Sequence, residues 1–154
     1  MDSKHDVVYA DDLRVGEKLE LGSYTVTEEE ILDFARQWDP QWFHVDAAAA
    51  EKGSFGGLIA SGIQTMAICQ RLSVDAFYSR WSVIAGRRIR GTEFIRPVRP
   101  DTVLSGTMTI EEIHIEHRNN RGSVALAIEL VDERGLQVFT MVTDVYVRCR
   151  PNVH

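Results

Sequence analysis

The sequence predicts an α+β fold in which a long, twisted antiparallel sheet wraps around one buried helix. Helical apolar spacing dominates before about residue 80 and strand-like alternation dominates after it, and this segregation is typical of α+β domains. The segment from Leu58 to Leu72 is apolar or small on nearly every side, as expected of a helix that is covered by other elements. The simplest packing therefore places this helix inside the curve of the sheet.

The composition indicates one globular domain, which we expect to cover residues 1–154. A chain of 17.4 kDa with 44% hydrophobic and 26% charged residues can bury a core without disulfides or metals. Cys69 and Cys149 lack the spacing of a metal site, so we expect a reducing compartment, no disulfide and no bound metal. The net charge of -6 argues against nucleic acid as a partner, although a local basic pocket could still receive phosphates.

No segment of the chain is typical of a membrane protein or of an exported one. The first twenty residues lack the apolar core of a signal peptide, and no run approaches the ~18 apolar residues of a membrane helix. We therefore expect a cytoplasmic protein without a membrane partner.

The first helix is predicted to begin at Thr27 and to end at the Asp39-Pro40 break. Thr27 and Glu30 form the two halves of a capping box, and Val26 faces Ile31 as a hydrophobic staple. The apolar residues at helical spacing, which should form one buried stripe, are Ile31, Phe34, Ala35 and Trp38.

A second, short helix is predicted after Asp46, which reads as its N-cap. This helix should end at Gly53 in a left-handed conformation. The third helix is the apolar segment from Leu58 to Leu72. Gly62 near its beginning costs about 1 kcal/mol relative to alanine, so its presence points to a packing or functional reason.

The second half of the chain predicts four strands joined by polar turns. Their ranges are roughly Arg87 to Phe94, Val103 to Ile115, Val124 to Val131, and Val138 to Arg148. Gly122 and Gly135 fall in the two expected hairpin turns. The apolar alternation slips between Ile110 and Ile113, which predicts a bulge, and His114 and His117 are expected at the surface.

An acid and an imidazole, Asp39 and His44, stand close together in the break WDPQWFHVD between the first two helices. A carboxylate and an imidazole that converge in a loop could hold one water molecule, one group taking its proton and the other delivering a proton to a substrate. The alternative is a simple Asp-Pro turn followed by a histidine that satisfies a local carbonyl group.

The stretch SFGGLIASG, from Ser54 to Gly62, leads directly into the apolar helix. The first N–H groups of such a helix have no acceptor within it and lie at the positive end of its dipole, where they favour an anion or oxyanion. The glycines Gly56, Gly57 and Gly62 could also serve tight turns and close packing alone, and both interpretations can hold together.

These segments together resemble the MaoC-like acyl dehydratases, the (R)-specific enoyl-CoA hydratase family of the hotdog fold. The order DPQWFHVD, FGGLIASG, apolar helix and TEFIRPVRPDTV covers nearly the whole chain. Asp39, His44 and Asp46 match the spacing of the family's motif, whereas Gln41 stands where asparagine is usual and Trp42 where a second proline is usual. The RPVRPDTV segment resembles the family's strand entry with one glycine missing.

The resemblance implies a carbon–oxygen lyase of fatty acid metabolism with a single-hotdog fold, usually a homodimer. Such an enzyme hydrates a trans-2-enoyl thioester to the (3R)-hydroxyacyl thioester or catalyses the reverse. Carried over by position, Asp39 is the base toward water, His44 is the proton donor, and the N–H of Gly62 holds the thioester oxygen. Contacts with the substrate are expected from Gln41, Trp42, Gly57 and Ser61. The substrate is an acyl-CoA or acyl-carrier-protein thioester, and no further cofactor is implied.

Two other functions remain open at this point. A hotdog thioesterase would share the fold and the thioester-binding helix start but cleave the C–S bond. A partner subunit without turnover would keep the fold alone. The arginines from Arg87 to Arg99 could bind the phosphates of the thioester carrier, or they could simply form a solvated strand face.

Overall fold

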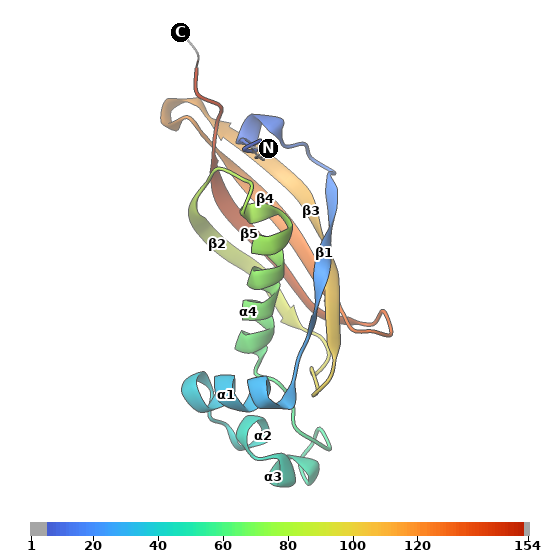
Figure 1. Cartoon of the computed structure of the whole chain (residues 1–154). Coiled ribbons are helices and arrows are strands. Elements are labelled where there is room, and N and C mark those ends of the chain that lie inside the picture. The colour runs from blue at the N-terminus through green and yellow to red at the C-terminus, as the bar shows by residue number, and fades with distance from the viewer. Residues whose placement is uncertain (1–5, 153–154) are drawn as a thin grey trace, which may run out of the picture.

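The computed structural model describes residues 6–152 and shows a sheet curved around a central helix (Figure 1). The predicted single domain over residues 1–154 extends past the described residues at both ends and stays a prediction. The helical elements are η1 (Ala10–Asp12), α1 (Glu28–Trp38), α2 (Trp42–Val45), α3 (Ala47–Glu51), α4 (Gly62–Ser73), η2 (Val74–Tyr78) and η3 (His117–Asn119). The strands are β1 (Lys18–Thr25), β2 (Val83–Phe94), β3 (Val103–Glu116), β4 (Arg121–Val131) and β5 (Gln137–Arg148).

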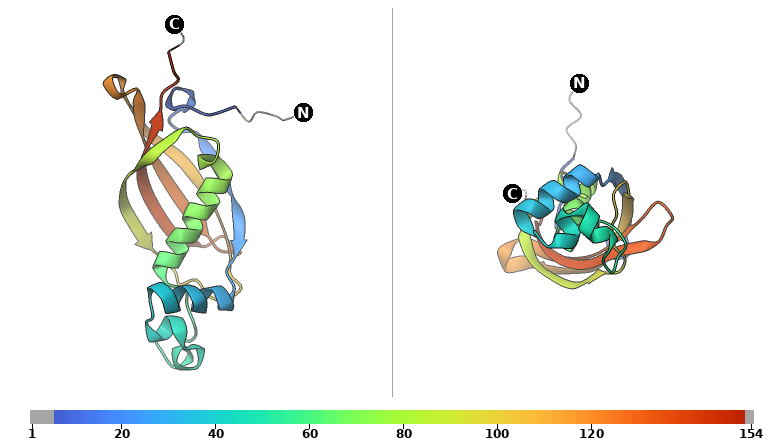
Figure 2. Two further views of the ribbon diagram at one scale, coloured as in Figure 1. Left: turned by 60° about the vertical axis from the view of Figure 1, so that its left-hand side comes forward. Right: turned by 90° about the horizontal axis from the view of Figure 1, so that it is seen from below.

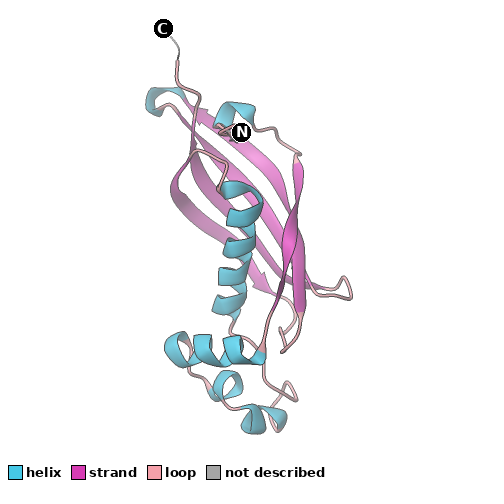
Figure 3. Cartoon of the chain, viewed as in Figure 1, coloured by secondary structure: helices cyan, strands magenta, loops and turns pink. Residues whose placement is uncertain are grey.

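The five strands form one antiparallel sheet in the order β1-β3-β4-β5-β2. Strands β3, β4 and β5 follow one another in sequence and in space, whereas β1 and β2 form the two edges. Helix α4 lies on the concave face, and the small helices α1 to α3 gather at its N-terminal end (Figures 2 and 3). The predicted α+β class and the wrapping of the sheet around the helix are both confirmed.

The core lies between α4 and the concave face of the sheet. Ile68 and Leu72 of α4 belong to one buried cluster with sheet residues such as Met108 and Leu126. Cys69 lies in this cluster as a free thiol, and burial raises its pKa to about 12, so the thiol stays protonated. None of the described helices is long and apolar enough to cross a membrane.

Helix α4 begins at Gly62, so the predicted start at Leu58 is wrong. Residues 58–61 are extended instead, because the N–H of Ile59 donates to the Phe43 carbonyl and that of Ala60 to the Val98 carbonyl. The helix is central, as predicted, but one face of it is exposed in the single chain, with Ile63 at 56% exposure.

The capping box of α1 is present as predicted. The hydroxyl of Thr27 accepts from the N–H of Glu30, and the carboxylate of Glu30 accepts from the N–H of Thr27. The buried stripe is shorter than predicted, because Trp38 is 63% exposed although Ile31 and Ala35 are fully buried. The helix ends at Trp38 with Asp39 as its C-cap, as the Asp-Pro sequence predicts.

Asp46 caps α3 as predicted, but two glycines differ from expectation. Gly53 is not left-handed; its Cα lies so close to the Trp42 ring that an added Cβ would clash with it at 2.5 Å. Gly122 lies inside β4, and Asn120 takes the left-handed position of that turn. Gly135 does turn with a positive φ of 78°, and Asp101, with φ of 67°, adopts the conformation that glycine usually supplies.

The strands run longer than predicted, and β1 was not predicted. The expected bulge in β3 is present, as a register shift against β4 between Ile110 and Glu112. Edge strand β2 begins at Val83 and is exposed along its length, with register shifts against β5 at three places. His114 and His117 are exposed, as predicted.

A charged cluster fastens edge strand β2 to β5. The Asp144 side chain is 3% exposed, and its carboxylate accepts from Arg88 Nε at 2.6 Å and from Arg90 Nη2 at 3.0 Å. Burial alone would raise the pKa of Asp144, but the two guanidinium groups outweigh burial and lower this pKa. Asp144 is therefore charged at neutral pH and bound to both arginines.

We predict that Asp144→Ala lowers the free energy of unfolding by ~1–3 kcal/mol, because two charge-assisted hydrogen bonds to a buried carboxylate are lost. Urea denaturation measures this change. The control is Asp33→Ala, which removes the exposed 3.7 Å pair with Arg36 and should change stability by less than ~0.5 kcal/mol. Equal effects of the two substitutions would contradict a stabilising role for the cluster.

Candidate active site

The residues predicted to be catalytic meet where α1 ends, α2 forms one turn and α4 begins. Asp39 is the C-cap of α1, and Pro40 follows it, so the chain leaves the helix axis at the acid. His44 lies in α2 and is only 4% exposed. The structure therefore places the acid and the imidazole together beside the start of the central helix.

Three neighbours surround the carboxylate of Asp39. Its Oδ1 accepts from Gln41 Nε2 at 2.8 Å, and its Oδ2 accepts from the Ser61 hydroxyl at 2.7 Å. The Nε2 atom of His44 lies 3.4 Å from the same Oδ2. The bond from Gln41 contributes most to lowering the pKa of Asp39, followed by that from Ser61; partial burial opposes them, and the charge of a protonated His44 adds to the lowering. Asp39 is thus held as a carboxylate.

The tautomer of neutral His44 follows from its second ring nitrogen. Nδ1 lies 2.7 Å from the carbonyl oxygen of Ile59, which can only accept, so Nδ1 carries a proton. Nε2, on the Asp39 side, is then the atom that can gain or lose a proton. The alternative raised by the sequence, a histidine that satisfies a local carbonyl, is thus also observed, and it orients the ring.

Gly62 is the first residue of α4, and its N–H has no acceptor among the described residues. Ser61 caps the helix, because its Oγ accepts from the N–H of Ile63 at 3.2 Å. A Cβ at Gly62 would lie 2.7 Å from the ring of Phe94, so only glycine lets this ring pack so closely against the helix start. The arrangement offers an N–H donor at the positive end of the helix.

A cavity of about 270 Å³ connects His44 with Gly62. Its other lining residues are mostly apolar: Phe55, Ile59, Ala60, Thr65, Phe94, Ile95, Arg96, Pro97, Val98 and Val138. Asp39 lies beside this cavity rather than in its lining, with 19% of its side chain exposed. The cavity can therefore take an elongated apolar molecule whose polar group meets His44 and the N–H of Gly62.

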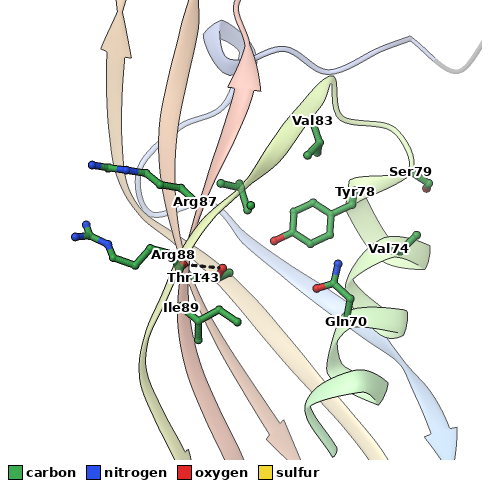
Figure 4. Close-up of a pocket in the computed structure, with 11 residues that line it drawn as sticks. Gln70, Val74, Tyr78, Ser79, Val83, Arg87, Arg88, Ile89 and Thr143 are labelled. Carbon is green, nitrogen blue, oxygen red and sulfur yellow. Dashed lines mark hydrogen bonds between the residues drawn. The ribbon is translucent and has the colours of Figure 1, made fainter. Parts of the chain in front are cut away.

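A larger cavity, of about 700 Å³, lies between the C-terminal half of α4, η2 and strand β2 (Figure 4). The side chains of Gln70 and Tyr78 point into it, while those of Arg87 and Arg88 point away (Figure 4). Its described lining has no carboxylate or imidazole, so it lacks groups for proton transfer at neutral pH. The smaller cavity, which His44 lines, is therefore the candidate site despite the difference in size.

The four residues expected to contact the substrate do not lie together: two of them contact Asp39, and the other two lie outside the cavity. Gln41 binds Asp39, and Ser61 is fully buried between Asp39 and α4, so both support the acid. The Trp42 ring packs against Gly53, and Gly57 lies under the guanidinium of Arg99. Neither Trp42 nor Gly57 lines the cavity of His44, and direct contact of these four with a substrate stays a prediction.

Of the residues that line the cavity, only His44 and Gly62 were predicted from the sequence as site residues, and Thr65 and Phe94 are among those that were missed. Thr65 lies one turn into α4, and Phe94 closes the far side at the end of β2. Phe94 is far from His44 in sequence, and only the pairing of β2 with β5 brings it across from Gly62. The spacing of apolar residues along the sequence does not predict a contact between residues so far apart in the chain.

Comparison with known proteins gives a consistent family relationship. The model of the family described as MaoC like domain matches residues 12–133. The uncharacterized protein YdeM of Bacillus subtilis is 34% identical over 140 residues, covering 90% of this chain and 97% of YdeM. A 3-hydroxyacyl-thioester dehydratase Z of Mycobacterium tuberculosis is 44% identical over 59 residues, which are 37% of this chain and 39% of that protein. The crystal structure of a MaoC-like dehydratase from Rhodospirillum rubrum superposes with a TM-score of 0.85 at 32% identity, covering 94% of this chain and 99% of the other.

We predict that Gln41→Ala and Ser61→Ala each raise the pKa of Asp39, with the larger rise for Gln41→Ala. Both lost hydrogen bonds favour the charged carboxylate, so their removal moves the pKa upward. Carbon-detected NMR titration of the Asp39 carboxyl measures the change. Gln37→Ala, on the exposed side of α1, is the control and should leave this pKa in place. An unchanged pKa in Gln41→Ala would show that the amide does not act on the acid.

Proposed function

Because the chain belongs to the MaoC-like domain family, we propose that it adds water to a trans-2-enoyl thioester to give a (3R)-hydroxyacyl thioester, or catalyses the reverse dehydration. The observation that carries the proposal is the 3.4 Å approach of His44 Nε2 to the Asp39 carboxylate beside the open N–H of Gly62. An acid–base pair and an oxyanion donor are the two requirements of this reaction.

Hydration begins with a water molecule at Asp39 and His44. Asp39, ionised because its neighbours lower its pKa, accepts a proton from this water. The water oxygen bonds to the β-carbon, and the electrons of the double bond move toward the thioester oxygen. The N–H of Gly62 donates to that oxygen as it becomes an enolate, and one well-placed donor of this kind contributes roughly 3 kcal/mol.

The reaction ends with proton delivery to the α-carbon. In this step His44 starts as the imidazolium, with a proton on each ring nitrogen, and gives its Nε2 proton to that carbon. The proton held by Asp39 then passes to Nε2 across the 3.4 Å gap and restores the imidazolium and the carboxylate. The product gains the elements of one water molecule, and both side chains return to their initial state. The bond from Nδ1 to Ile59 keeps the ring oriented throughout.

The thioester substrate is supported by the apolar cavity and by a relative. The dehydratase of Mycobacterium tuberculosis, which matches 37% of this chain, has 3-hydroxyacyl thioesters in its name. The cavity between Phe55, Phe94 and Ile59 suits the apolar atoms next to a thioester. Trp42 packs on Gly53 in the single chain, so the cavity lining of Phe55 and Phe94, rather than Trp42, is expected to limit the acyl group.

We predict that the pure protein hydrates crotonyl-CoA, and that Asp39→Asn and His44→Ala each reduce the rate at least ~100-fold. Loss of the conjugated-enoyl absorbance measures hydration, and a parallel assay of free thiol detects C–S cleavage. His114→Ala, an exposed histidine far along β3, is the control and should keep wild-type activity. Thermal melting checks that each variant folds.

The parallel assays separate the three candidate functions. Thiol release without prior hydration would assign a thioesterase instead. Wild-type activity in a folded Asp39→Asn protein would refute the role of the acid. Binding without either reaction would indicate the partner subunit without turnover.

We also infer that the protein works as a homodimer joined at strand β2. This edge strand leaves its outer hydrogen-bonding groups unpaired and exposes Ile84, Ile89 and Phe94, next to exposed Ile63 of α4. Pairing two copies at this edge would cover these side chains and border the cavity, because Phe94 also lines it.

We predict that Ile89→Asp converts the dimer to a monomer in sedimentation velocity, because Ile89 is 54% exposed on the edge strand and a charge there would be buried in the dimer. Leu136→Asp, in the β4–β5 turn at 39% exposure, is the matched control and should leave the dimer intact. A wild-type protein that sediments as a monomer would overturn the inference.

A further inference from the structure

Two arginines within strand β2 and two that follow it have different partners. Arg88 and Arg90 are bound to the buried carboxylate of Asp144, so their charges are compensated inside the fold. Arg96 and Arg99 instead donate to backbone carbonyl groups, Arg96 to Gln137 at 2.6 Å and Arg99 to Phe55. Neither Arg96 nor Arg99 has a carboxylate within ion-pair distance among residues 6–152, so both keep an uncompensated positive charge.

Arg96 is an exposed residue that the candidate active-site cavity shares with a second cavity. It lines the cavity that contains His44 and Gly62, and it also lines a neighbouring cavity of about 600 Å³. Arg99 lies in the lining of that second cavity, and the two cavities share Arg96 and Pro97. A molecule bound at Gly62 can therefore continue past Arg96 toward Arg99.

Gly57 explains why Arg99 can reach this position. A Cβ at Gly57 would lie 3.2 Å from Nη1 of Arg99, so the absence of a side chain leaves space for the guanidinium over the loop. The hydrogen bond from Arg99 to the Phe55 carbonyl then holds it there. A guanidinium fixed at one edge in this way still presents its remaining N–H groups to solvent.

The acidic side chains of the second cavity are partly engaged by other groups. Asp132 is bound by Arg134 at 2.7 Å, and Glu133 accepts from the N–H of Val103 at 3.1 Å. Asp101 is the remaining acid in that lining. The lining thus carries three arginines and three acids, and Arg96 and Arg99 are the two of these arginines that form no ion pair with a described residue.

We propose that Arg96 and Arg99 bind a phosphate group on the carrier arm of the thioester substrate. This inference rests on the proposed function. A thioester carrier is an elongated arm that ends in phosphate, either as coenzyme A or as the phosphopantetheine of a carrier protein. With the thioester at Gly62 and His44, the arm leaves past Arg96. Planar guanidinium groups bind phosphate oxygens in pairs of hydrogen bonds, so the arginines select a phosphorylated carrier.

The test compares three crotonyl thioesters on the full-length protein: those of coenzyme A, of 4′-phosphopantetheine and of pantetheine, which has no phosphate. The double variant Arg96→Ala/Arg99→Ala should lower kcat/KM for crotonyl-CoA, mostly through KM, by roughly 10- to 100-fold more than it lowers kcat/KM for crotonyl-pantetheine. Arg96→Lys/Arg99→Lys should recover much of the loss, since lysine retains the charge. Arg36→Ala, on exposed α1, is the control.

The pattern across substrates identifies which phosphate is bound. A loss with both phosphorylated thioesters assigns the arginines to the 4′-phosphate, which coenzyme A shares with a carrier protein. A loss confined to crotonyl-CoA assigns them to the nucleotide phosphates. An equal loss with crotonyl-pantetheine, or no loss with any substrate, overturns the proposal.

Calorimetry with free coenzyme A separates this inference from the proposed function. If the wild-type protein hydrates none of the three thioesters, the hydratase proposal fails on its own. The arginines are then judged by binding alone: weaker binding of coenzyme A by Arg96→Ala/Arg99→Ala than by Arg36→Ala supports them, and equal binding overturns them.

Discussion

The site depends on one buried hydroxyl group, that of Ser61. Its oxygen accepts from the N–H of Ile63 and so caps α4, and the same hydroxyl donates to the carboxylate of Asp39. The start of the central helix and the predicted base are therefore fixed to each other by a single side chain that is fully buried. Because Ser61 directly precedes Gly62, any shift of the helix start would move the open N–H and the acid together.

The sheet supplies the second constraint, through the extended residues 58–61 that lead into α4. The Val98 carbonyl, just after β2, and the Phe43 carbonyl of α2 hold this segment from two sides. Its Ile59 carbonyl in turn accepts from His44. The imidazole is thus oriented by a backbone carbonyl of a segment that the end of the sheet positions, and not by a flexible side chain.

Features that depend on residues close together in the sequence could be predicted from it. The capping box of Thr27, the break at Asp39 and the bulge near Ile110 were all predictable, because each depends on neighbouring residues. Strand β1 was not, because its apolar alternation is limited to Leu19 and Leu21 before Gly22 and Ser23 interrupt it. The exposure of Trp38 could not be predicted either, since a helical stripe does not reveal where the neighbouring surface ends.

Gln41 and Trp42, the two residues that differ from the family's usual motif, make contacts of different kinds. Gln41 keeps what an asparagine at that position could supply, an amide donor, because its Nε2 reaches Oδ1 of Asp39. Trp42 replaces a proline, but its ring packs on the bare Cα of Gly53, outside the cavity of His44. The first departure acts on the ionisation of the acid, whereas the second acts on how the α2–α3 segment packs. Replacing the usual motif residues by Gln41 and Trp42 is therefore compatible with the proposed reaction, provided that Asp39 stays ionised and the N–H of Gly62 stays without an acceptor in the protein.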